Sequence, residues 1–96
     1  MKKPKIVWDD LAKQELKAIY NYYKPISTKV ADAILDNIAI GIEEIRFTHQ
    51  YQKDVIQPEY RRLIVSHYKV IYMVEATKIT ILSIFDTRQD QNKQNL

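Results

Sequence analysis

Residues 60–88 alternate between apolar runs and very short polar breaks. Three runs rich in β-branched and aromatic side chains have the length of strands: 60–66, 68–75 and 78–85. The breaks between them, at Ser66-His67 and at Ala76-Thr77, are too short for a parallel crossover, which needs roughly a dozen residues. The pattern therefore predicts an antiparallel meander of three strands.

The first half of the chain predicts a strand followed by two helices: residues 5–8, about 11–23 and about 28–47. Asp9 or Asp10 is suited to cap the first helix and Ser27 the second, because their side-chain oxygens accept orphan backbone N–H groups. Pro25 ends the first helix, since the residue before a proline is pushed out of helical geometry. Apolar residues recur along both helices at three- and four-residue steps, which predicts a helical hairpin.

Together these elements predict an α+β fold: an N-terminal strand, a helical hairpin and the meander, with the helices covering one sheet face. Residues 1–88 form a single domain in this prediction, and the polar residues 89–96 form a C-terminal tail. Gly41, the only glycine, lies inside the second helix at a cost of about 1 kcal/mol relative to Ala. It indicates close approach of the first helix or of the sheet.

Composition narrows the functional classes. No apolar run approaches the roughly 20 residues that span a bilayer, and the basic start of the chain leads into a strand instead of a secretory signal. The 96 residues include no cysteine, which excludes disulfides and thiolate metal sites and fits a cytoplasmic protein. The net charge of +3 permits an anionic partner without requiring one.

The usual catalytic and cofactor motifs are absent from the sequence. One glycine cannot build a phosphate-binding loop. Neither His49 nor His67 lies in a helical His-Glu-x-x-His pattern, so we expect no metal site and no cofactor. The serines lack the elbow and the neighbouring base of a hydrolase triad. What remains is a concentration of positive charge on the predicted sheet.

Alternation along the strands predicts where that charge lies. The uncharged set on the middle strand is the better core face: Tyr68, Val70, Tyr72 and Val74. Lys69 and Ile71 lie on the opposite face, which we expect to be open. Arg61 opens the first strand of the meander, and Arg88 follows the third, near Lys69 or Arg61 if the register allows. Cations gathered on an open sheet face would bind phosphate or carboxylate.

The segment PEYRRLIVSHYKVIYMV, followed by ITILSIFDTRQD, resembles the C-terminal half of the RelE/ParE toxin superfamily. Its strongest parts are Tyr60-Arg61, the Tyr-Lys-x-x-Tyr pattern from Tyr68 to Tyr72, and Phe-Asp-Thr-Arg ending at Arg88. The upstream order of strand and helical hairpin is similar too. The resemblance implies the toxin of a bacterial type II toxin–antitoxin pair.

This superfamily divides by target. RelE-like members are ribosome-dependent endoribonucleases that cut messenger RNA, whereas ParE-like members are regarded as poisons of DNA gyrase and not as nucleases. Under the RelE-like alternative, the resemblance places Arg61, Lys69 and Arg88 in the catalytic site. Leu63, however, stands where a second catalytic lysine is expected, and Gln94 stands about where the tail would carry tyrosine or histidine.

These two departures favour the ParE-like branch. Leucine and glutamine cannot transfer protons, whereas general acid–base help is typically worth ~10²–10⁴-fold. His67 is the one nearby titrating group that would restore a nuclease. Ordinary roles also account for the charges: Arg61 and Arg62 would protect a sheet edge, and Arg88 would pair with Asp86 or Asp90. A further alternative is an inactive member of the fold that only binds its antitoxin.

The resemblance implies a cognate antitoxin as partner, and no membrane. We expect an extended or helical antitoxin segment over the open sheet face or the helical hairpin, in a hetero-oligomer or beside a toxin homodimer. The residues expected to contact the antitoxin or the target are Arg61, Arg62, Leu63, Lys69, Ile71, Arg88 and Tyr22.

Overall fold

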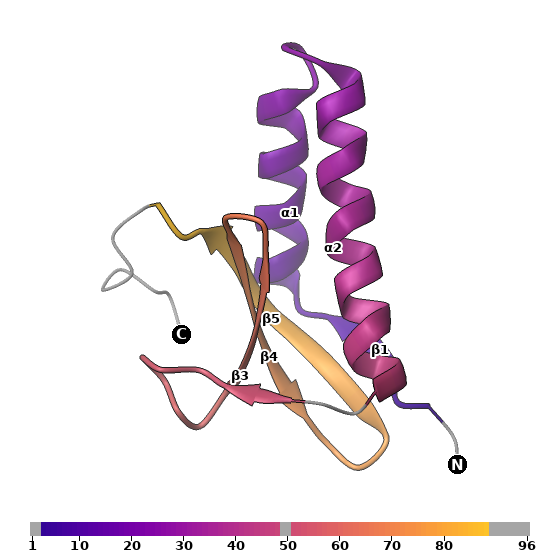
Figure 1. The fold of residues 1–96 in the computed structure, drawn as a ribbon, viewed down its shortest axis with the longest axis vertical. Coiled ribbons are helices and arrows are strands. Elements are labelled where there is room, and N and C mark those ends of the chain that lie inside the picture. The colour runs from indigo at the N-terminus through magenta and orange to yellow at the C-terminus, as the bar shows by residue number, and fades with distance from the viewer. Residues whose placement is uncertain (1–2, 49–50, 89–96) are drawn as a thin grey trace.

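The computed structural model describes residues 3–48 and 51–88 (Figure 1). Its elements in chain order are β1 (Lys5–Trp8), α1 (Asp10–Tyr23), α2 (Thr28–Thr48), β2 (Gln52–Lys53), β3 (Arg61–Val65), β4 (Tyr68–Val74) and β5 (Lys78–Asp86). The predicted strand, helical hairpin and three-strand meander are confirmed. The two-residue strand β2 is an addition that the sequence pattern does not predict. The predicted tail, 89–96, lies outside the described residues.

The strands form one mixed sheet in the order β1-β5-β4-β3-β2. β1 pairs with β5 in parallel, with Lys5 opposite Lys78 and Trp8 opposite Ile81, and the other neighbours are antiparallel. The first and last strands are therefore side by side. The antiparallel ladder of β4 and β5 shifts register between Ile71 and Tyr72.

Side-chain caps begin both helices, as the sequence predicts. The Asp9 carboxylate accepts a hydrogen bond from the Leu11 backbone N–H at 3.3 Å, and the Ser27 hydroxyl accepts one from the Val30 N–H at 3.2 Å. Each bond satisfies a backbone donor that has no partner within the helix. Lys24, just before Pro25, is the C-terminal cap of α1.

The core lies between the helical hairpin and one face of the sheet. Its fully buried members include Ile38 and Ile42 of α2, Tyr72 of β4, and Ile79 and Ile81 of β5. Burial of these side chains is the main stabilising contribution to such a domain. The core face predicted for β4 is confirmed.

Gly41 is a point of close approach between α2 and the sheet. A Cβ atom at this position would lie 3.0 Å from Val65 Cγ2 and 3.2 Å from Leu63 Cδ2 of β3. The predicted close approach is confirmed, and its partner is the sheet. Leu63 therefore faces α2, which corrects the expectation that it lies on an open face for an antitoxin to cover.

The turn between α1 and α2 extends well beyond the sheet (Figure 1). Tyr22 and Ile26, close to that turn, are 67% and 70% exposed. The helices are amphipathic, and none in the described ranges is long and apolar enough to cross a membrane.

Candidate functional site

The register of β3 and β4 places the predicted cationic residues on different faces of the sheet. Arg61 lies opposite Tyr72, a core residue, whereas Lys69 lies opposite Ile64. Because alternate residues of a strand point to opposite faces, Arg61 shares the helix-facing side and Lys69 the other side. The two cations therefore cannot converge on one substrate across that sheet face.

The face that carries Lys69 is covered at Lys69 and Ile71, so the expectation that it is open is wrong at these two positions, whereas Ile64, opposite Lys69, is 47% exposed. Lys69 is 1% exposed and Ile71 is 0% exposed. Lys69 Nζ lies 2.5 Å from Oδ1 of Asp54, which is itself 1% exposed. The segment between β2 and β3 thus carries a carboxylate onto this face and neutralises the charge there.

Asp54 also holds the turn in which it lies. Its Oδ2 accepts the Gln57 backbone N–H at 2.7 Å, and its own N–H donates to the Tyr60 carbonyl at 3.0 Å. On the opposite side of the ion pair, Lys69 Nζ lies 5.8 Å from the centre of the Phe85 ring. Each charge of this buried pair thus has its counter-charge within the protein, and the carboxylate also accepts a backbone N–H.

Arg61 is half-buried beside two tyrosines. The rings of Tyr51 and Tyr72 meet edge to face, with centroids 6.3 Å apart. Burial raises the pKa of Tyr72 to about 12, and Tyr51 adds to that rise, while the charge of Arg61 opposes it. Arg61 thus lies at the edge of the core beside Tyr72, and a role in binding a target stays a prediction.

Arg88 is tied to Asp86 instead of joining Arg61 or Lys69. Its Nε lies 3.0 Å from Asp86 Oδ1, and its Nη2 lies 2.5 Å from Oδ2. The hydrogen bond from Arg88 is the main reason that the pKa of Asp86 falls to about 2. Pairing of Arg88 with Asp86, anticipated from the sequence, is confirmed.

Arg61 and Arg88 are also far apart along the sheet. Tyr72 lies opposite Arg61, and Tyr68 lies opposite Asp86, so four residues of β4 separate the two positions. At about 3.3 Å per residue that is roughly 13 Å along the strand alone. The three predicted catalytic cations therefore do not form a single site.

The Asp86–Arg88 pair lies at a polar cleft of about 330 Å³ between α1 and the end of β5. Its lining is Ile19, Tyr22, Tyr23, Tyr68, Asp86 and Arg88. Tyr22 packs edge to face on Tyr23 with ring centroids 5.0 Å apart. Burial and the Tyr23 hydroxyl raise the pKa of Tyr68. The contact role predicted for Tyr22 stays a prediction.

His67 occupies the β3–β4 turn, where Ser66 adopts a positive φ of 56°. Its ring packs on Tyr68 with centroids 4.5 Å apart, and its Nδ1 lies 3.3 Å from the Ser66 hydroxyl. Its Nε2 is buried, with no hydrogen-bond partner among the described residues. Its charge helps to lower the pKa of Asp86. His67 thus lies at the Asp86 end of the sheet.

No group of His, Asp and Glu within the described ranges is arranged to hold a metal ion.

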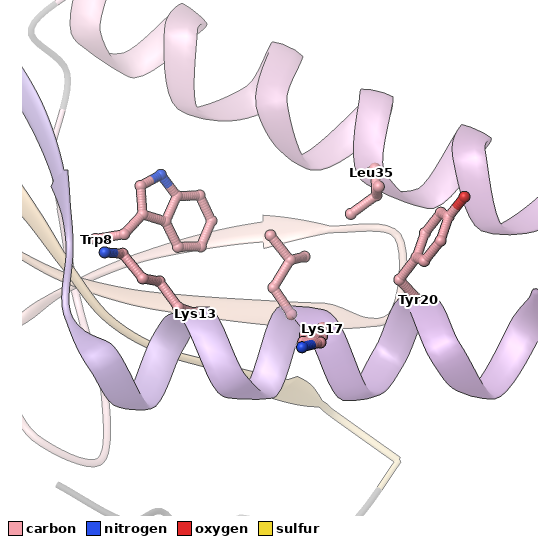
Figure 2. Close-up of a pocket in the computed structure, with 6 residues that line it drawn as sticks. Trp8, Lys13, Lys17, Tyr20 and Leu35 are labelled. Atoms are coloured by element: carbon pink, nitrogen blue, oxygen red, sulfur yellow. The ribbon is translucent and has the colours of Figure 1, made fainter.

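An apolar groove lies between α1 and α2, and the sequence pattern does not reveal it (Figure 2). It has a volume of about 430 Å³ and is lined by Trp8, Lys13, Leu16, Lys17, Tyr20 and Leu35. Trp8 also lines a second hollow of about 240 Å³ beside β1, with Ile6, Ala39, Ile42 and Glu43. Trp8 and Tyr20 are both partly buried, and Trp8 also packs against the core.

Solved structures of toxin–antitoxin systems share this fold. One chain of a chromosomal ParDE system from P. aeruginosa superposes with a TM-score of 0.75 at 20% identity, covering 88% of this chain and 96% of that one. A chain of the RelB–RelE antitoxin–toxin complex from Methanococcus jannaschii gives a TM-score of 0.56 at 15% identity, covering 85% and 91%. The chain therefore shares the fold of these two structures.

A family model defines the chain more closely. The model described as the ParE toxin of type II toxin–antitoxin system, parDE, matches residues 6–91. The chain belongs to the ParE toxin family. No similar sequence is found among curated proteins.

Proposed function

We propose that this ParE toxin acts in the bacterial cytoplasm by binding and poisoning DNA gyrase, and that a cognate antitoxin neutralises it. Residues 1–88 carry the toxin domain in this proposal. The toxin acts through its binding surface and not as a nuclease.

The burial of Lys69 against Asp54 carries this proposal. A phosphodiester-cleaving site needs cations that approach the substrate together, since charge stabilisation and proton transfer occur at adjacent oxygens. Here Lys69 is neutralised within the protein, and Arg61 lies on the other face of the sheet. Leu63, at the position of a second catalytic lysine, packs against α2. The described residues thus favour a binding toxin over the RelE-like alternative.

The antitoxin follows from family membership. The similar structures are those of a ParDE system and of a RelB–RelE antitoxin–toxin complex. Groups on this chain that are free to contact such a partner include the exposed side chains of Tyr22 and Ile26 on the helical hairpin. Ile71, expected to contact the partner, is fully buried and does not offer a surface to it.

Induction of the protein alone in a bacterial host tests the proposed function. We expect growth arrest accompanied by relaxed plasmid or by cleaved plasmid with protein attached. Transcript ends, mapped in the same cultures, should show no cleavage at ribosomal A sites. Arrest with normal supercoiling and cut transcripts would support the endoribonuclease instead. Normal growth with folded toxin accumulating would indicate an inactive member that only binds its antitoxin.

A further inference from the structure

Three large apolar side chains are exposed beside the buried Lys69–Asp54 pair. Ile64 lies opposite Lys69 across the β3–β4 ladder and is 47% exposed. Val55 and Ile56 directly follow Asp54 in the chain and are 70% and 41% exposed. Because the Asp54 carboxylate is held against Lys69, the chain brings all three to one region, on the side of the sheet opposite the helices. We call Val55, Ile56 and Ile64 the outer patch.

The outer patch is apolar surface that this chain leaves in contact with water. Single exposed apolar residues are ordinary, whereas several gathered in one place indicate an interaction surface. A second surface laid over them gains free energy by excluding water. It would also keep solvent from the neighbouring ion pair, whose side chains are 1% and 0% exposed. The outer patch is therefore a candidate docking surface, and the charges next to it indicate what docks there.

Two side chains of opposite charge lie next to the outer patch along the chain. Arg62 is two residues from Ile64 on β3, so both point to the same sheet face. The Arg62 Nε is buried and has no hydrogen-bond partner among the described residues. Glu59, which is exposed, takes part in none of the ion pairs found within residues 3–48 and 51–88. A buried donor without a partner costs free energy, which an acceptor from another molecule would recover.

This pairing of one cation with one anion favours a second copy of the chain as the occupant. In a twofold contact the same surface meets itself, so each of two different residues touches the other one across the interface. Arg62 of one copy would then meet Glu59 of the other, and the contact would occur twice. A surface of a single sign would instead favour an oppositely charged partner. The charges next to the outer patch balance, although the whole chain carries a net charge of +3.

We propose that the protein forms a twofold homodimer through the outer patch, in which Arg62 of each protomer binds Glu59 of the other. The apolar side chains form the centre of the interface, and the two ion pairs form its rim, as is usual between proteins. The helical hairpins stay outside this interface, because they pack on the opposite face of the sheet. The proposal goes beyond the proposed function and requires neither gyrase nor an antitoxin.

Analytical ultracentrifugation of the purified full-length chain tests the dimer, at concentrations from about 1 μM to about 1 mM. The mass of the wild type should rise with concentration from 11.4 kDa toward twice that value. Ile64→Asp should weaken the dimer at least about tenfold, because it places carboxylates in the apolar centre of the interface. Ile40→Asp, at a 64% exposed position of α2, is the matched control and should leave the dimer unchanged. Circular dichroism verifies that each variant is folded.

Charge exchange tests the reciprocal ion pairs. Arg62→Glu and Glu59→Arg should each weaken the dimer, because each places like charges opposite one another at both contacts. Mixing the two single variants should restore a dimer of one copy of each, since both contacts then join opposite charges. The double variant should also dimerise by itself. Exchange of two exposed charges on α2, by Lys29→Glu with Asp36→Lys, alters the same number of charges and should have no effect.

A wild type that stays monomeric at every concentration would overturn the proposal. A dimer that is indifferent to Ile64→Asp, or single variants at Arg62 and Glu59 that do not recover when mixed, would do the same. Loss of gyrase poisoning or of antitoxin binding in a monomeric Ile64→Asp protein would assign the outer patch to that partner instead. Because the dimer is measured on the purified chain alone, its failure leaves the gyrase proposal standing, and failure of the gyrase assay leaves the dimer standing.

Discussion

The ammonium group of Lys69 lies 2.5 Å from the carboxylate of Asp54, and both side chains are almost completely excluded from solvent. The pair joins the centre of the sheet to the segment between β2 and β3. It accounts for two findings: the sheet face opposite the helices is covered at Lys69, and the cation expected at a nuclease site is neutralised within the protein.

Lys69→Met should strongly destabilise the protein, because it leaves the Asp54 carboxylate buried without its counter-charge. Loss of one partner of a buried pair costs about 3–5 kcal/mol. The double variant Lys69→Met with Asp54→Leu should be more stable than Lys69→Met alone, although it loses the Gln57 hydrogen bond. Urea unfolding of the wild type, Lys69→Met, Asp54→Leu and the double variant gives the coupling energy between the two side chains. A Lys69→Met variant as stable as the wild type would show that the pair is not formed in solution.

The effect of Gly41→Ala on stability should depend on the side chain at position 65. Alanine gains about 1 kcal/mol over glycine in helix propensity, but its Cβ would lie 3.0 Å from Val65 Cγ2. A Val65→Ala background removes that contact and leaves the one to Leu63 Cδ2 at 3.2 Å, so Gly41→Ala should be more favourable there than in the wild type, by up to about 1 kcal/mol. In the wild type, the overpacking should cancel or reverse this gain. Equal effects in both backgrounds would contradict the close approach of α2 to β3.

Glu15 accepts hydrogen bonds from the Ser83 hydroxyl at 2.8 Å and the Ile84 backbone N–H at 3.1 Å. Burial raises the pKa of Glu15, and these two bonds oppose the rise only in part. A raised pKa in the folded state means that this group's contribution to stability is full below the unfolded pKa and is lost as pH rises through the folded value.

Glu15→Gln keeps an acceptor but does not ionise. Its stability relative to the wild type should therefore increase as pH rises from about 4 to about 7. Glu15→Leu removes the acceptor and should cost about 1–3 kcal/mol throughout that range. Urea midpoints measured across the pH series provide the check. A flat difference between Glu15→Gln and the wild type would show that the carboxylate is not buried as described.

The contribution of Asp86 to stability should depend on pH in the opposite sense to that of Glu15. Its pKa is lowered to about 2 by Arg88, so its contribution is present above the unfolded pKa and is lost as pH falls toward 2. The Arg88 side chain is 63% exposed, so solvent screening makes this contribution small. Asp86→Asn should lose stability at pH 7 and show a shallower acid limb in thermal unfolding. An unchanged acid limb would contradict the pairing.

Local signals were sufficient to predict most of the fold. Caps at Asp9 and Ser27, helical periodicity and two-residue breaks each act over a few residues and give the order of elements. The parallel pairing of β1 with β5 joins residues more than 70 positions apart, for example Lys5 and Lys78, so no local pattern could place it.

The candidate site was predicted less well for the same reason. Alternation correctly placed Lys69 and Tyr72 on opposite faces of β4. It cannot predict that a carboxylate 15 positions upstream, that of Asp54, pairs with Lys69. Asp54 lies in an aperiodic stretch, and its turn forms only through contacts with Gln57 and Tyr60. The groove at Trp8 depends on how β1, α1 and α2 pack together, which apolar spacing alone does not determine.

A reconstituted reaction with purified gyrase tests the central claim most directly. Gyrase, relaxed plasmid, ATP and the purified toxin are combined, and the DNA is examined after denaturation and protease treatment. We expect loss of supercoiling and accumulation of gyrase-cleaved linear plasmid that depends on toxin concentration, with no cleavage when gyrase is omitted. Normal supercoiling at every toxin concentration, alongside ribosome-dependent cutting of messenger RNA by the same preparation, would contradict the account.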